Sequence, residues 1–124
     1  MISDQDIAAY ERDGVVCLRG VLGREWTDLL DRGIDRNIAH PGPQFTDFTR
    51  SGETARCIKD DWCWQWIPEY RDFVQRSPLA GIVGALMRAR EVCFIEEQYF
   101  QKEAGAKTPT PILHPIRCWP ETWT

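Results

Sequence analysis

Cysteine and histidine are the residues of this 124-residue sequence best suited to hold a metal or to attack a substrate. They are Cys17, Cys57, Cys63, Cys93, Cys118, His40 and His114. The last four cysteines and His114 have the donor types of a zinc site, but structural zinc usually involves closely spaced pairs of cysteines, which this sequence lacks. A cysteine activated by one of the histidines has no local signal in its favour either. Both a zinc site and a nucleophilic thiol therefore remain open.

Two adjacent carboxylates, Glu96 and Glu97, interrupt the segment with the strongest strand pattern. A catalytic pair of carboxylates must converge on one substrate atom, whereas neighbours in a strand point to opposite faces of the sheet. We therefore expect one of the two to lie in solvent. Lys102 shares a strand face with Glu96 and stands at the end of the strand, where a lysine commonly extends its ammonium into water.

Three tryptophans, Trp62, Trp64 and Trp66, alternate with other residues and would line one face of an extended segment. Such a face can stack nucleic-acid bases or sugars. Here no basic residues are interleaved, and the chain has a net charge of -4, so we predict a core stripe instead. The same charge argues against a nucleic-acid partner and an anionic membrane surface.

The composition is that of one soluble globular domain, with 43% hydrophobic and 27% charged residues. No apolar run approaches the roughly 18 residues of a spanning helix, and the acidic N-terminus has no apolar leader core. The odd, irregularly spaced cysteines favour reduced thiols in the cytoplasm. Cys17 and Cys93 lie in apolar runs and are expected to be buried as small hydrophobic side chains.

The elements that must position these residues are mostly helices, followed by one long strand. Helices are expected from Ser3 to about residue 12, from residue 24 to before His40, from Pro68, and over residues 79–87. Residues 15–18 and 91–102 are expected to be strands, residues 61–66 an extended stripe, and residues 41–56 a loop. Residues 104–111 contain glycine and prolines that end the last strand.

Short segments spread over almost the whole chain form a recognisable series when they are taken in their order along the sequence. They are residues 7–16 (IAAYERDGVV), 18–22 (LRGVL), 61–62 (DW), 64–65 (WQ), 67–74 (IPEYRDFV), 77–80 (SPLA), 90–92 (REV), 102–103 (KE), 108–111 (TPTP) and 119–120 (WP). In this order they resemble the N-terminal portion of the phytanoyl-CoA dioxygenase family of Fe(II)- and 2-oxoglutarate-dependent oxygenases.

The resemblance implies an α+β fold, with N-terminal helices and the first strands of a double-stranded β-helix (jelly roll). Residues 1–124 would form a single partial domain with an incomplete barrel. In the family, a His-x-Asp pair and a later His bind iron, which leaves positions open for 2-oxoglutarate and O₂. A lysine on the strand before that motif often contacts 2-oxoglutarate, and Lys102 matches it.

The sequence departs from the family where the metal motif should stand. After Pro111 the family has Trp-His-x-Asp, whereas Leu113 and Pro115 occupy the His and Asp positions here. A shift by one residue recovers His114 but places Ile116, which has no metal-binding atom, at the carboxylate position. The sequence also stops before a second His and a distal basic residue, so we expect a truncated, catalytically inactive form. A reading-frame disturbance would explain this pattern, and translation of the coding DNA in the other frames tests it.

By resemblance, the reaction would be hydroxylation of a small organic substrate, coupled to decarboxylation of 2-oxoglutarate. His114 would be the metal ligand that remains and Lys102 the cofactor contact that remains. The alternative is a non-catalytic module that binds a protein or self-associates through the exposed edge of the strand at 91–102. A zinc-binding domain is the third interpretation.

Overall fold

The computed structural model describes residues 2–110, so His114 and Cys118 lie outside the described residues. The elements are α1 (Asp4–Asp13), α2 (Arg24–Ala39), β1 (Thr46–Asp47), β2 (Cys57–Asp61), the 3-10 turn η1 (Cys63–Gln65), α3 (Pro68–Arg76), α4 (Leu79–Leu86) and β3 (Gln98–Lys102). This arrangement confirms the expected α+β class.

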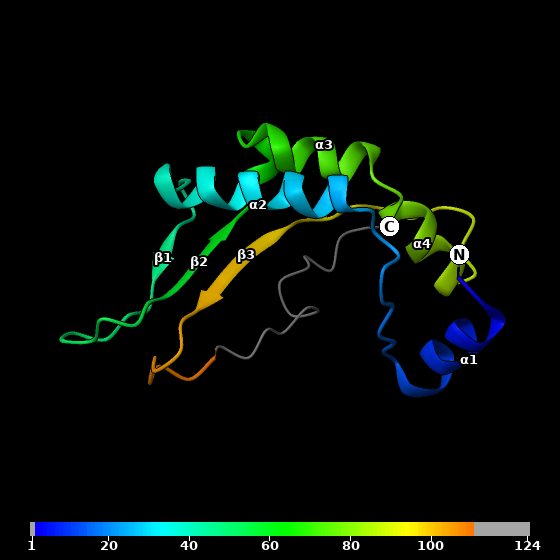
Figure 1. Ribbon diagram of the computed structural model, residues 1–124, viewed down its shortest axis with the longest axis horizontal. Helices are drawn as coiled ribbons and strands as arrows, with labels where there is room; N and C mark the ends of the chain where they lie inside the picture. The colour runs from blue at the N-terminus through cyan, green and yellow to red at the C-terminus, as the bar shows by residue number, and fades with distance from the viewer. Residues whose placement is uncertain (1, 111–124) are drawn as a thin grey trace, which may run out of the picture.

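The strands form one antiparallel sheet in the order β1-β2-β3. Figure 1 shows α2 and α3 side by side over one face of this sheet, while α1 and α4 pack together beyond its end. None of the helices in residues 2–110 combines the length and apolar character that crossing a membrane requires. The molecule therefore has a helix layer on one side of a small sheet.

Local signals in the sequence set the helix ends. At α1, the Ser3 hydroxyl accepts from the Asp6 N–H at 3.2 Å, and the Asp6 carboxylate accepts from the Ser3 N–H at 2.9 Å. Gly14 ends this helix with a φ of 72°, a left-handed conformation that glycine adopts readily. Pro68 begins α3, and Ser77 accepts from the first N–H of α4. The four expected helices are confirmed.

The strand predictions were only partly correct. Residues 15–18 form no strand, and Val15 is 69% exposed, because no neighbouring strand covers that run within residues 2–110. Only Gln98–Lys102 of the expected strand at 91–102 pairs with a neighbour. The segment 41–56 includes the two-residue strand β1, and β2 was not expected at all. At residues 15–18 and 91–97, short apolar runs therefore predict strands that the structure does not contain.

The interpretation of the tryptophans as an extended core stripe was wrong. Trp62 has a left-handed φ of 64° and turns the chain directly into η1. The turn sends Trp62 and Trp66 to the surface, while Trp64 stays partly buried against the core. A period of two in the sequence has this meaning only where the backbone stays extended.

The core forms where η1 and α3 meet α2. Cys63, Ile67 and Tyr70 are buried there, with Leu30, Ile34 and Trp64 packed against them. Cys57 and Cys63 are buried, whereas Cys17 and Cys93 are exposed, so the expectation that the latter two are core side chains was wrong. Their apolar neighbours in sequence are themselves largely outside the core.

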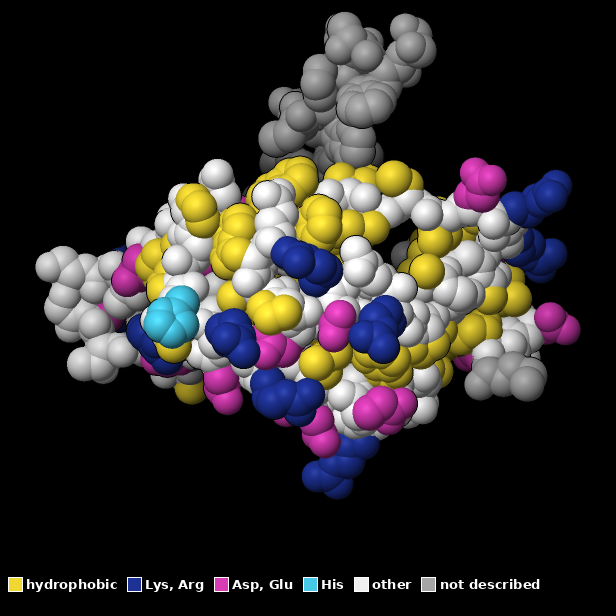
Figure 2. Space-filling model, turned by 90° about the horizontal axis from the view of Figure 1, so that it is seen from above, with side chains coloured by type: hydrophobic (Ala, Val, Ile, Leu, Met, Phe, Trp, Pro, Cys, Tyr) yellow, Lys and Arg dark blue, Asp and Glu magenta, His cyan; other side chains and the backbone are white. Residues whose placement is uncertain are grey.

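The outer face of the helix layer is charged. Figure 2 shows basic and acidic side chains mixed over the side of the molecule that carries α2 and α3. Arg36 of α2 makes a two-pronged contact with Glu69 of α3, with a shortest N–O distance of 2.8 Å. This bond ties the two helices together, and the mixed charge indicates a face exposed to water.

Candidate functional site

A fully buried carboxylate, Asp60, stands between the sheet and the end of α2. One oxygen accepts from the Asn37 side-chain N–H at 2.8 Å and from the Gly42 backbone N–H at 2.6 Å. The other oxygen accepts from the Asp61 N–H at 3.1 Å. Because alternate residues of β2 face the helix layer, Asp60 reaches both α2 and the turn that follows it. Its charge is stabilised by three N–H groups.

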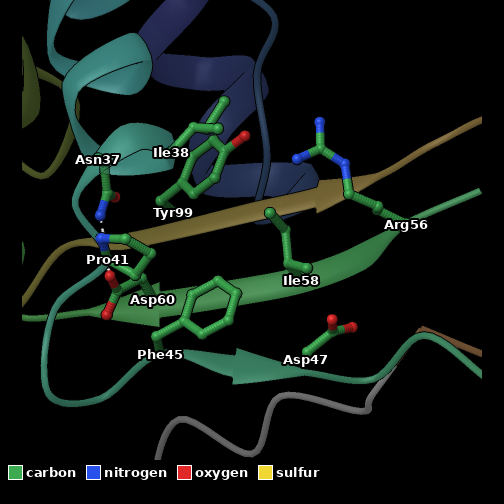
Figure 3. Close-up of a pocket in the computed structure, with 9 residues that line it drawn as sticks. All are labelled: Asn37, Ile38, Pro41, Phe45, Asp47, Arg56, Ile58, Asp60 and Tyr99. Carbon is green, nitrogen blue, oxygen red and sulfur yellow. Dashed lines mark hydrogen bonds between the residues drawn. The ribbon is translucent and has the colours of Figure 1, made fainter.

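A hollow of about 190 Å³ adjoins this carboxylate. Figure 3 shows Asn37 and Asp60 at one end of the hollow and Arg56 and Asp47 at the other, with apolar side chains between them. Its lining residues are Asn37, Ile38, Pro41, Phe45, Asp47, Arg56, Ile58, Asp60 and Tyr99. A cavity of this size can hold a molecule about as large as one aromatic ring.

The polar groups around this hollow are already used by the fold. Arg56 Nε lies 2.8 Å from Glu103 Oε1, and the second oxygen of Glu103 accepts from the Arg56 N–H, which holds the pKa of Glu103 below its usual range. Asp47 accepts from the Thr49 N–H at 2.7 Å, and hydrogen bonding to Thr49, through its side chain and then its backbone, lowers the pKa of Asp47. The hollow thus presents no nucleophile with an adjacent base, and it suits packing better than chemistry.

Cys63 is the cysteine closest to this network. Burial and the nearby Asp60 carboxylate raise the pKa of the Cys63 thiol, so it stays protonated at neutral pH. A protonated, buried thiol is neither a nucleophile nor a good metal ligand. Residues 2–110 contain no group of three or more His, Cys, Asp or Glu side chains arranged to hold a metal ion. The thiol-nucleophile interpretation therefore fails for Cys63.

The neighbouring carboxylates Glu96 and Glu97 diverge as expected. Glu96 is exposed, whereas Glu97 is partly buried and accepts from the Trp64 N–H at 3.1 Å through Oε1. Its Oε2 is buried without a hydrogen-bond partner in the described part of the chain. Burial raises the pKa of Glu97, because the charged form loses water.

We predict that Glu97→Gln makes the protein more stable at pH 8. The pKa of Glu97 is higher in the folded state than in the unfolded state, so its contribution to the free energy of unfolding is fully present below the unfolded-state pKa. That contribution is lost as the pH rises through the folded-state pKa, because the partly buried carboxylate then becomes charged. Glutamine stays neutral and keeps an acceptor for Trp64. The expected gain is about 0.5 kcal/mol, since water screens a partly exposed group. Urea unfolding at pH 4 and pH 8 measures the difference.

Glu96→Gln is the matched control, because Glu96 is exposed and adjacent. It should leave the pH dependence of unfolding unchanged. A loss of stability in the Glu97→Gln variant at pH 8 would show that the folded state requires the charge.

Lys102 lies at the end of β3 and is exposed, as the sequence indicated. The register places it opposite Cys57, on the sheet face away from the hollow beneath α2. Lys59 and Asp61 occupy the same face and form an ion pair at 2.7 Å. Within residues 2–110, Lys102 makes no ion pair.

The two candidate site residues cannot be compared in space, because His114 lies outside the described residues. The sequence offered no signal for Asp60, whose partners come from another helix and the turn after it. No family model, curated protein or solved structure matches the chain.

Proposed function

We propose that the chain forms the N-terminal part of a double-stranded β-helix related to the phytanoyl-CoA dioxygenases and does not turn over by itself. The observation that carries this proposal is the sheet with helices on one face and Lys102 on the other. A jelly roll needs such a sheet, because its second face must remain free to enclose the barrel interior. Lys102 is then the contact for one carboxylate of 2-oxoglutarate.

The other charged and polar side chains on this face of the sheet support this assignment, because they are already paired. Gln98 lies on the same face of β3, and its side chain donates to Asp61 at 2.8 Å. Asp61 in turn neutralises Lys59. Lys102 is therefore the cation of this face with no carboxylate partner in the described part of the chain, and a dianionic ligand would be attracted to it. The substrate class implied by the resemblance is a small organic molecule.

The donor set does not fit an iron site. An iron(II) oxygenase needs two histidines and a carboxylate on one side of the metal. The sequence contains His40 and His114, and His40 follows α2 at its C-terminal cap, in the helix layer. Ile116 and Pro115 stand where the carboxylate is required. At most His114 remains as a ligand, and this is why we propose an inactive chain.

We predict that 2-oxoglutarate binds weakly and that Lys102→Met reduces its affinity at least about tenfold, because a lost charge-assisted contact has that effect. Titration calorimetry of the full chain with 2-oxoglutarate alone measures the affinity. No succinate should form after Fe(II), O₂ and 2-oxoglutarate are added.

Lys107→Met is the matched control, since Lys107 is an exposed lysine with no ion pair in residues 2–110. Equal loss of affinity in both variants would contradict a specific role for Lys102, as would the absence of binding. Succinate production with one tightly bound iron per chain would contradict the proposed inactivity.

A further inference from the structure

The outer edge of β3 has no neighbouring strand within residues 2–110, because the sheet order is β1-β2-β3. Two backbone bonds show how β3 is oriented. The Glu97 carbonyl accepts from the Trp62 N–H, and the Glu103 N–H donates to the Arg56 carbonyl. Odd-numbered residues therefore direct their backbone groups toward β2. The even-numbered residues Gln98, Phe100 and Lys102 direct theirs toward the open edge.

This edge lacks two of the usual protections against pairing, a proline and a bulge. β3 contains no proline, and its register with β2 runs without a bulge. The segment just before it carries exposed apolar side chains, with Phe94 at 41% and Ile95 at 50% exposure. An open row of N–H and C=O groups beside exposed apolar side chains is a template for a further strand.

We propose that a second copy of this chain pairs antiparallel with this edge, about a two-fold axis at Tyr99. In this register Gln98 of one copy lies opposite Phe100 of the other. Both residues direct their backbone groups outward, so they form a hydrogen-bonded pair. The two sheets become one sheet of six strands, three from each copy. The helix layers lie on the same side, since the axis is perpendicular to the sheet.

Charge complementarity selects a second copy as the occupant. With the axis at Tyr99, Glu96 of one copy lies opposite Lys102 of the other, and symmetry repeats the pair. Both side chains are exposed, and neither makes an ion pair within residues 2–110. One chain therefore supplies both halves of each ion pair.

The neighbouring registers are less favourable. An axis at Phe100 brings Glu97 opposite Glu103, which are two like charges. An axis at Gln98 places Lys102 opposite the apolar Phe94. Registers shifted by a single residue pair outward-facing groups with inward-facing groups and lose the hydrogen bonds. The Tyr99 axis thus satisfies backbone and charge together.

Sedimentation velocity over a concentration series tests the proposal with the full chain. The wild-type protein should be a concentration-dependent dimer. Glu96→Lys and Lys102→Glu should each raise the dimer Kd about thirtyfold, because two attractions become two repulsions. The double variant with both reversals should return the Kd to near the wild-type value. Circular dichroism confirms folding of each variant.

Carbodiimide coupling provides a measurement without substitutions. In a mixture of unlabelled and ¹⁵N-labelled chains, mass spectrometry should find Glu96 of one copy joined to Lys102 of the other. A wild-type monomer at all concentrations would overturn the inference. A dimer that ignores both reversals, or that the double reversal does not restore, would overturn this interface and register. Glu96→Lys changes the interface without altering Lys102, so it tests this inference separately from the proposed contact between Lys102 and 2-oxoglutarate.

Discussion

Replacing Asp60 with alanine should lower the free energy of unfolding by about 3 kcal/mol, the cost of leaving buried hydrogen-bond donors without their acceptor. Asn37 Nδ2 and the Gly42 N–H both donate to one Asp60 oxygen, at 2.8 and 2.6 Å. The carboxylate is fully buried, so its removal takes away the only protein acceptor that these donors have in residues 2–110. The end of α2 then loses its attachment to β2. Urea unfolding at pH 7 measures the loss.

Asp31→Ala is the matched control, because Asp31 is an exposed aspartate of α2 with no side-chain bond in residues 2–110. Its removal should change the stability by less than about 0.5 kcal/mol. An Asp60→Ala protein as stable as this control would show that the bonds from Asn37 and Gly42 to Asp60 do not hold the helix layer to the sheet.

The helices could be predicted because their signals are local. Ser3 and Asp6 satisfy each other's backbone groups within one turn, and Gly14 ends α1 without needing any distant contact. Pro68 works in the same way at α3. Such residues act on the backbone beside them, so the sequence alone indicates where helices begin and end.

Strand β2 could not be predicted, because its sequence lacks the alternation of apolar and polar residues that is typical of a half-buried strand. It contains Lys59, Asp60 and Asp61, and the central one of these charged residues faces the helix layer. Burying Asp60 requires donors from Asn37 and Gly42, which are distant in sequence. A buried, satisfied carboxylate is therefore a tertiary feature that no local pattern indicates.

In the candidate site, too, the sequence predicts the features that depend on local residues and misses those that depend on distant contacts. The position of Lys102 at a strand end follows from the β-branched and aromatic residues before it and the glycine and prolines after it, and the structure places it there. Its role toward 2-oxoglutarate rests on the resemblance and stays a prediction. Cys17 and Cys93 were misplaced because apolar neighbours in sequence indicate burial only when another element covers them.

Replacing Gly33 with valine should destabilise the protein by about 3 kcal/mol, at the upper end of the cost of overpacking a core. Gly33 is buried at the point where α2 contacts α3, and a Cβ there would lie 2.7 Å from the Tyr70 ring. The ring cannot easily move away, because Tyr70 is 5% exposed and its hydroxyl donates to Asn37. Guanidinium unfolding monitored by tryptophan fluorescence measures the change.

Gly81→Val separates steric overlap from the effect of valine on a helix. Gly81 is also a helical glycine, but a Cβ built there meets no atom within 4 Å, so the same substitution causes no steric overlap. Its stability should stay within about 0.5 kcal/mol of wild type, because valine and glycine differ little in helix propensity. If the two variants unfold alike, the close approach of α2 and α3 at Gly33 does not limit stability. If only Gly33→Val is destabilised, the absence of a side chain at position 33 is what allows the Tyr70 hydroxyl to reach Asn37. Asn37 is then held in place as a donor to the buried Asp60 carboxylate.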